Sequence, residues 1–201
     1  QGLKALCEKW GLLLIADETM TGMGRTGKLF AVDHYDVEPD IIIMGKALGA
    51  YCPLSATIFS NKVATAFDNQ IFGHGQSHSG HALACAAGLA SLEVIQEAGF
   101  LDRVNALGQY LQRKLIELAA SHTSIVDIRG LGLFWTAELS TDPSSQKAVR
   151  RATEKYEETV VSQIAAYLLN EKNVYMPSDK FGLWIVPPLI VTEPEIDFVI
   201  Q

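Results

Sequence analysis

The sequence has few cysteines, little positive charge and no long apolar run. Its 201 residues include 16 Lys and Arg against 23 Asp and Glu, which gives a net charge of −7. This acidic balance argues against a protein whose main task is to bind nucleic acid or an anionic membrane. No stretch reaches about 18 uninterrupted apolar residues, so a membrane span is not expected. Neither nucleic acid nor membrane is therefore expected as a partner.

The cysteines give no framework for disulfides or zinc. Cys7, Cys52 and Cys85 lie far apart, and none belongs to a CxxC pair. An odd, sparse set of this kind is typical of reduced thiols in a cytoplasmic protein. The first residues have no signal-peptide pattern. We expect a cytoplasmic location and no metal site.

The apolar content is sufficient for a core. Apolar residues make up 48% of the chain and charged residues 19%, and a compact chain of this size buries about 70% of its extended surface. Short apolar runs predict strands buried on both faces, and apolar residues at helical spacing predict helices. The predicted strands are 12–16, 41–44, 54–59, a pair within 125–139 interrupted at 129–132, and 183–190. The predicted helices are 79–97, 101–118 and 156–168.

These elements predict an α/β part followed by a smaller α+β part, with a boundary near Gly99. The domains are therefore expected at 1–98 and 99–201. Residues 3–10 resemble the end of a helix, and residues 192–201 the start of one, with Thr192 as N-cap and Pro194 in the first turn. We expect a fragment cut at both ends.

Two ionisable residues follow apolar runs. Asp17 ends the run at 12–16, and Lys46 follows the run at 41–44, with a connection long enough to place the two strands side by side in parallel. Ligand sites in α/β sheets open at such strand ends. One interpretation is a buried ion pair. The other is a pyridoxal phosphate (PLP) site. In such a site, partial desolvation lowers the pKa of a lysine below its ordinary value of about 10.4, so that its amine reacts with an aldehyde. A carboxylate keeps the pyridine nitrogen of the cofactor protonated.

A glycine-rich segment offers a rival function. Residues 22–28 fit both GxGxxG and GxxxxGK, which occur in nucleotide sites. However, Leu29 stands where a P-loop needs a hydroxyl for magnesium, and acids precede the segment. A tight loop with positive φ angles is the alternative that we favour.

A second polar loop, residues 72–81, precedes the helix at 79–97. Its hydroxyls and amides suit phosphate binding at a helix start. His74, His78 and His81 raise the alternative of a metal site, but no Cys, Asp or Glu joins them. A third alternative is a helix cap made by Ser77 or Ser79.

Taken together, these segments resemble the class III (ω-type) aminotransferases, PLP enzymes of fold type I. The resemblance covers nearly the whole chain in the correct order. The matching segments are Asp17–Lys28 with DExxTGxGRTG, Glu38–Lys46 with PDxxxxxK, Phe72–His81 with HGxT[YF]SGHP, and two later landmarks at Arg129–Gly132 and Pro187–Ile190. The resemblance implies part of the large-domain α/β/α sandwich followed by a small, truncated α+β domain.

The resemblance also implies residue roles. Lys46 is implied as the Schiff-base lysine and proton shuttle, and Asp17 as the partner of the pyridinium nitrogen. Thr19 is implied to pack on the ring of pyridoxal 5'-phosphate, and Ser77 to donate to its phosphate, within a homodimer that shares its active sites. The implied reaction moves an amino group from a small-molecule amine donor to a keto acid or aldehyde acceptor.

The chain departs from the family pattern in places. The family usually has Val at the position of Thr19, and Ser77 replaces the usual Thr. Many members carry an Arg shortly before the later PPL landmark, but here Lys180 is the only cation between Val174 and Val186. A donor with a distal amine fits this difference. Arg129 is assigned a structural role.

Other functions of the same motifs stay open. An aminomutase, racemase or decarboxylase of the same fold would share the cofactor motifs. A further alternative is an inactive fragment, because the N-terminal half of the enzyme, which the resemblance implies to carry part of the phosphate site, is not in the chain. We expect the 201 residues alone to bind PLP weakly and to transaminate poorly.

Overall fold

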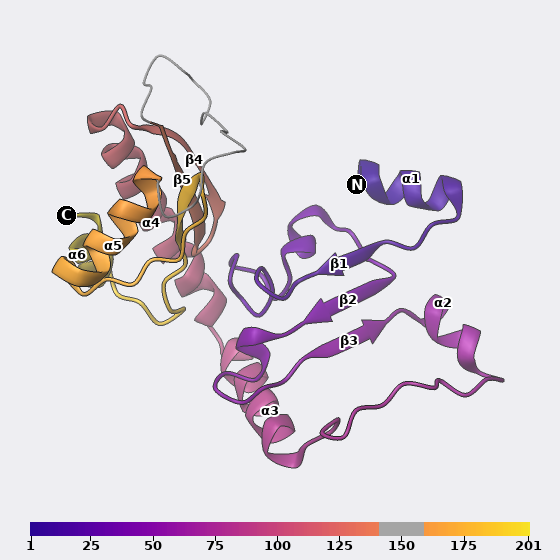
Figure 1. Ribbon diagram of the computed structural model, residues 1–201. Coiled ribbons are helices and arrows are strands. Elements are labelled where there is room, and N and C mark those ends of the chain that lie inside the picture. The colour runs from indigo at the N-terminus through magenta and orange to yellow at the C-terminus, as the bar shows by residue number, and fades with distance from the viewer. Residues whose placement is uncertain (141–158) are drawn as a thin grey trace. The chain divides into compact units, whose positions relative to one another are not determined.

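The computed structural model describes residues 1–140 and 159–201 (Figure 1). The chain divides into two units, Gln1–Leu101 and Asp102–Gln201, where the sequence predicts a boundary near Gly99. Tyr156, the first residue of one predicted helix, lies outside the described residues. Each unit is considered by itself.

The first unit is built on a three-stranded sheet in the order β1-β2-β3. β1 and β2 are parallel, as the sequence predicts, with Asp17 opposite Ile43, and β3 is antiparallel to β2. The strands are β1 (Ile15–Asp17), β2 (Ile41–Met44) and β3 (Ala56–Phe59). The helices are α1 (Gly2–Trp10), α2 (Asn61–Ala64) and α3 (Ala82–Gln96), with 3-10 turns η1 (Ala31–Tyr35), η2 (Lys46–Leu48) and η3 (Thr65–Phe67).

The core of this unit lies where α3 meets the turn after β2. Met44, Leu48 and Ile95 are buried together. α3 contacts this turn closely because it presents Gly88, where an added Cβ would lie 2.6 Å from Leu54 Cδ2. The Ala- and Gly-rich sequence of α3 therefore permits the contact that supports the segment carrying Lys46.

The expectation of strands buried on both faces is wrong for β1. Ile15 is 54% exposed, and Leu12 and Leu13, which lead into the strand, are also exposed. β1 is an edge strand, and the described residues provide no layer over these side chains.

A buried carboxylate fixes the start of β2. Asp40 is 4% exposed and accepts hydrogen bonds from the Leu14 N–H at 2.8 Å and from Lys62 Nζ at 3.0 Å, with Lys4 Nζ at 3.5 Å. These donors, the Leu14 amide foremost, lower the pKa of Asp40 to about 2. Asp40 thereby holds the chain before β1 beside the start of β2.

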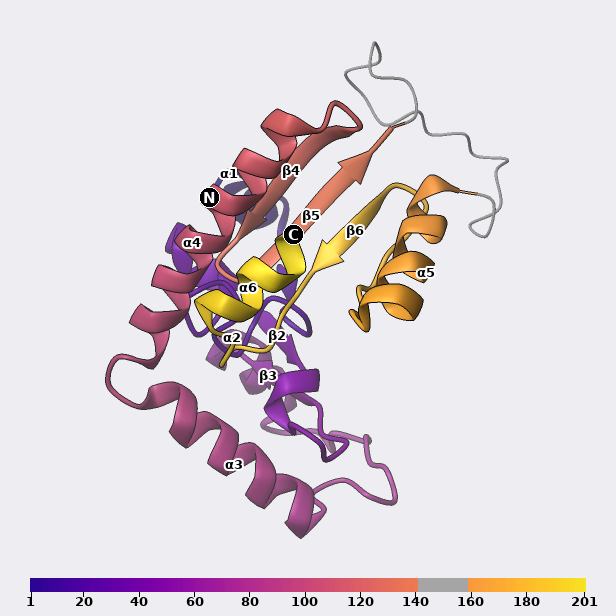
Figure 2. The same ribbon diagram turned by 90° about the vertical axis from the view of Figure 1, so that its left-hand side faces the viewer.

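The second unit is an antiparallel sheet in the order β4-β5-β6 (Figure 2). α4 lies along this sheet and buries Val104, Leu107, Leu111 and Leu115, which confirms the predicted amphipathic helix. β4 continues to Leu131, so the turn comes slightly later than predicted. The elements are α4 (Phe100–Ser121), β4 (Ile125–Leu131), β5 (Phe134–Leu139), α5 (Val160–Lys172), β6 (Gly182–Ile185) and α6 (Glu193–Ile200).

Two local features of the second unit follow from sequence. An added Cβ at Gly108 would lie 2.7 Å from backbone atoms of Gly132, so α4 needs glycine where it meets the β4–β5 turn. α6 begins at the predicted N-cap, because Thr192 and Glu195 form a capping box with the Thr192 N–H 2.8 Å from Glu195 Oε2.

Within the described ranges, no single helix has both the length and the apolar composition of a membrane span; α3 and α4 meet that test only when taken together.

Candidate active site

The carboxyl ends of β1 and β2 place Asp17 and Lys46 at one edge of the sheet. Asp17 is the last residue of β1, and Lys46 comes two residues after Met44 ends β2. Because the two strands are parallel and Asp17 stands opposite Ile43, both residues leave the sheet on the same side. The charge of Lys46 acts on Asp17 and lowers its pKa. The structure therefore places the two predicted residues at the same edge of the sheet.

Asp17 is held as a carboxylate by its neighbours. The Thr19 side chain and the Thr19 N–H, which donates to Asp17 Oδ1 at 3.0 Å, are the two largest causes of its lowered pKa. The Lys46 charge lowers the pKa further. Both Asp17 and Lys46 are exposed, so the alternative of a buried ion pair is wrong.

Lys46 begins η2 with an unusual backbone conformation. Its φ is +48°, in the left-handed region that residues with a Cβ seldom adopt. The expectation of a partly desolvated lysine is also wrong for this chain, because the described residues leave Lys46 exposed. Lys46 therefore holds a strained backbone conformation directly after the end of β2.

Thr19 neighbours both Asp17 and Gly45, the residue before Lys46. It is half-buried, and a Cβ built on Gly45 would lie only 3.3 Å from Thr19 Cγ2. A side chain at position 45 would therefore make a tight contact with the methyl group of Thr19.

The glycine-rich loop after Thr19 is organised by Glu18. This side chain is 3% exposed, and its carboxylate accepts a hydrogen bond from the Val32 N–H at 2.9 Å and another from the Thr21 hydroxyl. Sequence reasoning missed this role, because the only signal was an acid next to Asp17. Glu18 therefore holds the loop against η1.

The structural interpretation of this glycine loop is confirmed. Gly24 and Gly27 have φ angles of 84° and 90°, as a tight loop requires. Lys28, the lysine of the apparent GxxxxGK pattern, donates from Nζ to the Asp33 carbonyl at 2.9 Å. Its amine thus serves to close the loop, as expected for a structural segment.

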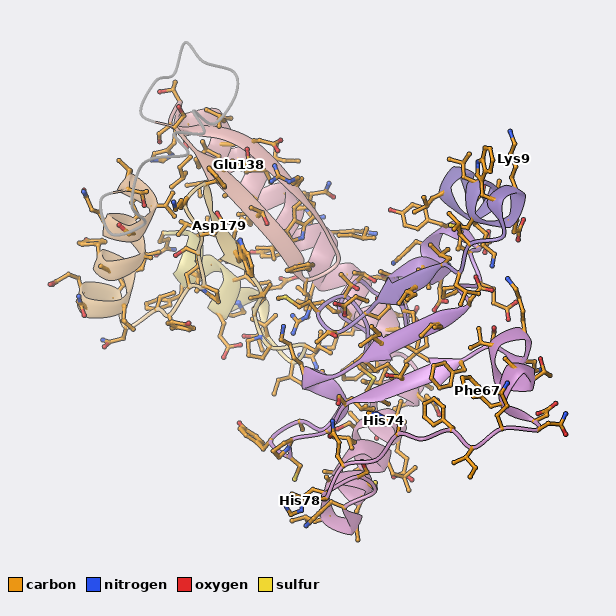
Figure 3. The ribbon with its side chains drawn as sticks, turned by 45° about the vertical axis from the view of Figure 1, so that its right-hand side comes forward. Lys9, Phe67, His74, His78, Glu138 and Asp179 are labelled. Atoms are coloured by element: carbon orange, nitrogen blue, oxygen red, sulfur yellow. The ribbon has the colours of Figure 1, made fainter. Side chains whose placement is uncertain are left out.

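Ser77 lies in the exposed loop between η3 and α3. The loop is attached to the unit by Phe72, whose ring contacts Phe59, Phe67 and His74 at centroid distances of 5.7, 5.0 and 5.9 Å. Phe67 and His74 are labelled in Figure 3. Sequence reasoning missed this cluster, although aromatic residues on both sides of the loop were a signal for it. In the part of the chain that the structure describes, no group of three His, Cys, Asp or Glu side chains could hold a metal ion.

The residues present fit PLP. The cofactor needs a primary amine for its aldehyde and a carboxylate for its ring nitrogen, and Lys46 and Asp17 provide both at one sheet edge. The methyl group of Thr19, which the resemblance assigns to the cofactor ring, lies beside Gly45 at the same edge. The roles of Asp17, Thr19, Lys46 and Ser77 toward the cofactor stay predictions.

Solved structures define the class of protein. An S-selective transaminase from Arthrobacter sp. matches 98% of this chain with a TM-score of 0.90 and 30% identity, and 44% of that protein is covered. Taurine:2-oxoglutarate aminotransferase from Bifidobacterium kashiwanohense, solved with PLP and glutamate, matches 99% of the chain with a TM-score of 0.90 and 30% identity, over 46% of its own length. The fold is that of a PLP-dependent transaminase of fold type I.

The family follows from the sequence as a whole. The model for class III aminotransferases matches residues 1–201, so the chain belongs to this family. Acetylornithine aminotransferase of Methanocaldococcus jannaschii is 38% identical over 100% of the chain and 46% of its own length. Diaminobutyrate–2-oxoglutarate transaminase of Halomonas elongata is 34% identical over 98% of the chain and 43% of its own length. The chain thus spans slightly less than half the length of these relatives and corresponds to their C-terminal part, which confirms the resemblance drawn from the motifs.

Proposed function

We propose that this chain carries the catalytic lysine and the ring-nitrogen carboxylate of a PLP-dependent transaminase. The observation that carries the proposal is the placement of Asp17 and Lys46 at the ends of adjacent parallel strands, in a chain that matches the class III family throughout. The proposed reaction moves an amino group from a small-molecule amine to a keto acid or aldehyde.

Each residue has a defined task in this reaction. When bound, PLP supplies an aldehyde that captures the substrate amine and a protonated ring that takes up the electrons of the broken C–H bond. The Asp17 carboxylate holds the proton on the ring nitrogen. Lys46 would hold the cofactor between turnovers; its released amine would then take the proton from the substrate carbon as a general base and donate it to the cofactor carbon as a general acid. Ser77 is proposed to donate its hydroxyl to the phosphate.

The proposed donor carries an amine distant from any carboxylate. Lys180 is the only cation between Val174 and Val186, so an arginine clamp for an α-carboxylate is absent from that part of the sequence. The printed names of several relatives fit this class, because acetylornithine, diaminobutyrate and taurine each offer such an amine.

A second candidate is elimination of ammonia by the same site. The (R)-1-hydroxy-2-aminoethylphosphonate ammonia-lyase of Vibrio splendidus is 32% identical over 99% of this chain. Its similarity to this chain is close to that of the transaminases, so the cofactor residues alone do not separate the two reactions.

We also propose a homodimer with shared active sites and a cytoplasmic location. The exposed position of Ser77 supports the dimer, because a phosphate donor on an exposed loop is able to serve a neighbouring subunit. The cysteines support the location, since Cys7, Cys52 and Cys85 are free thiols.

The proposal is tested in an enzyme that joins the N-terminal part of the Methanocaldococcus jannaschii relative to this chain. With PLP, 2-oxoglutarate and N-acetylornithine, diaminobutyrate or taurine, we expect glutamate to form with at least one donor. The Lys46→Ala variant should lose this activity, and the 201 residues alone should show little of it. Release of ammonia without glutamate would favour the second candidate. A folded, PLP-binding chimera that produces neither would contradict the proposal.

A further inference from the structure

The helix α1 presents apolar side chains that its own unit does not cover. Leu3, Leu6 and Trp10 recur at intervals of three and four residues, and all three are exposed. Because each residue of a helix turns by about 100°, the three side chains form one stripe. α1 is attached to its unit by a different side, through the buried Cys7 and the ion pair of Lys4. The stripe therefore takes no part in holding α1 in place.

A second group of exposed apolar side chains follows in the chain that enters β1 (Figure 1). Leu12, Leu13 and Ile15 are exposed, and no charged residue or proline stands between Gly11 and Ala16. Charges and prolines are the residues that ordinarily protect a free strand edge. The three residues of the α1 stripe and these three together are called the α1–β1 surface. Exposed apolar side chains in this number mark a place of contact with another protein segment.

β1 also has backbone groups that are free to pair. In the part of the chain that the structure describes, β1 is paired with β2 alone, so its other edge is open. Leu14 and Glu18 direct their backbone hydrogen bonds toward β2. Because successive residues of a strand face opposite edges, Ile15 and Asp17 turn their N–H and carbonyl groups to the open edge. A strand supplied from outside the described residues is able to pair there.

The length of the relatives indicates what covers this surface. The chain corresponds to the C-terminal part of two aminotransferases, of which it spans 46% and 43%. The remaining length of these relatives lies mainly before the position of Gln1, and Gln1 is the N-cap of α1. In a protein of that length, the preceding part joins the chain directly beside the α1–β1 surface. A second copy of this chain has no such connection to it.

We propose that the α1–β1 surface binds the N-terminal part of a class III aminotransferase. A strand of that part pairs with the open edge of β1, and its apolar side chains cover the six exposed ones, whose burial drives the contact. Because Asp17 is the last residue of β1, the same strand reaches the sheet edge that carries Asp17. The surface belongs to a different segment from the Ser77 loop, which is assigned to a neighbouring subunit.

The test compares the 201-residue chain with the enzyme that joins the N-terminal part of the Methanocaldococcus jannaschii relative to it. Leu13→Asn places a polar group on the surface, and Leu169→Asn on α5 is the matched control, because both leucines are 47% exposed. We expect Leu13→Asn to lower the Tm of the joined enzyme by several degrees more than the Tm of the chain alone, since Leu13 is buried only in the joined enzyme. Leu169→Asn should shift both Tm values equally.

Hydrogen exchange of the unsubstituted proteins gives a second measurement that needs no variant. The Ile15 and Asp17 amides, followed in peptides that cover residues 11–17, should exchange rapidly in the chain alone and slowly in the joined enzyme. If the joined Leu13→Asn enzyme does not fold, this comparison decides the question.

Either of two results would overturn the inference. One is an equal effect of Leu13→Asn in both proteins, with unchanged exchange at residues 11–17. The other is a dimer of the chain alone that protects these residues and dissociates in Leu13→Asn, because the occupant would then be a second copy. None of these measurements uses PLP or activity, so the result is independent of the proposed function.

Discussion

Replacing Lys46 by glycine should stabilise the chain relative to replacing it by alanine. Lys46 has a φ of +48°, and a left-handed conformation costs a residue with a Cβ about 1–2 kcal/mol. Glycine avoids this cost but loses about 0.5–1 kcal/mol more conformational freedom on folding. The difference leaves Lys46→Gly more stable than Lys46→Ala by about 0.5–1 kcal/mol. Side-chain contacts contribute little to the comparison, because Lys46 is exposed.

The assay is urea denaturation of both variants, supported by thermal unfolding. For a chain of this length the expected difference in Tm is about 1–4 °C. Two neighbours provide matched controls. Ala50 is exposed with a φ of +51°, so Ala50→Gly should also stabilise, whereas Ala47 is exposed within η2 without a positive φ, and Ala47→Gly should destabilise by about 0.5–1 kcal/mol.

A Lys46→Gly chain that is less stable than Lys46→Ala, by the amount seen for Ala47→Gly, would refute the reasoning. It would mean that position 46 has an ordinary backbone conformation.

Three further changes test the fold that supports the site. The pKa of Asp40 in the folded chain is about 2, below its ordinary value of 3.8. The ionised carboxylate therefore stabilises the fold above about pH 4, and this stabilisation is lost as the pH falls toward 2. The loss of stability in acid should be smaller in Asp40→Asn, as measured by urea denaturation at several pH values. Gly108→Ala should cost about 1–3 kcal/mol, because its Cβ would meet the Gly132 backbone. Gly88→Ala should cost less, since its Cβ would meet only a movable Leu54 side-chain end. Thr192→Ala should cost about 1 kcal/mol through loss of the α6 cap, measured by thermal unfolding.

Each of these predictions has a contradicting result. Equal acid sensitivity of the original chain and Asp40→Asn would remove the role assigned to the buried carboxylate. A Gly108→Ala chain as stable as the original would contradict the close approach of α4 to the β4–β5 turn. An unchanged Tm in Thr192→Ala would show that the capping box contributes nothing measurable.

The sequence predicted the elements that local pattern determines. The apolar run at 41–44 coincides with β2, and the capping residues Thr192 and Pro194 start α6 as predicted. The connection between β1 and β2 is long enough for parallel pairing, which the structure has, and this pairing predicts that Asp17 and Lys46 lie at one sheet edge.

What failed depends on contacts between distant parts of the chain. Three apolar runs predicted buried strands, but burial also requires covering layers, and the described residues leave Ile15 exposed. The anchoring of Asp40 by Leu14, Lys4 and Lys62 has no local signal, because charged residues in a sequence do not indicate which of them meet. The hydrogen bond from the Thr19 N–H to Asp17 Oδ1 likewise depends on a turn after β1 that the apolar pattern does not predict.

The central claim is that Asp17 and Lys46 form a specific PLP site. The most direct measurement uses the enzyme that joins the N-terminal part of the Methanocaldococcus jannaschii relative to this chain. It is incubated with limiting PLP and reduced with borohydride, and the modified lysine is located by peptide mass spectrometry. The account predicts modification concentrated at Lys46 and lost in Asp17→Ala. Modification spread over exposed lysines such as Lys9 and Lys62, with no preference for Lys46, would contradict it.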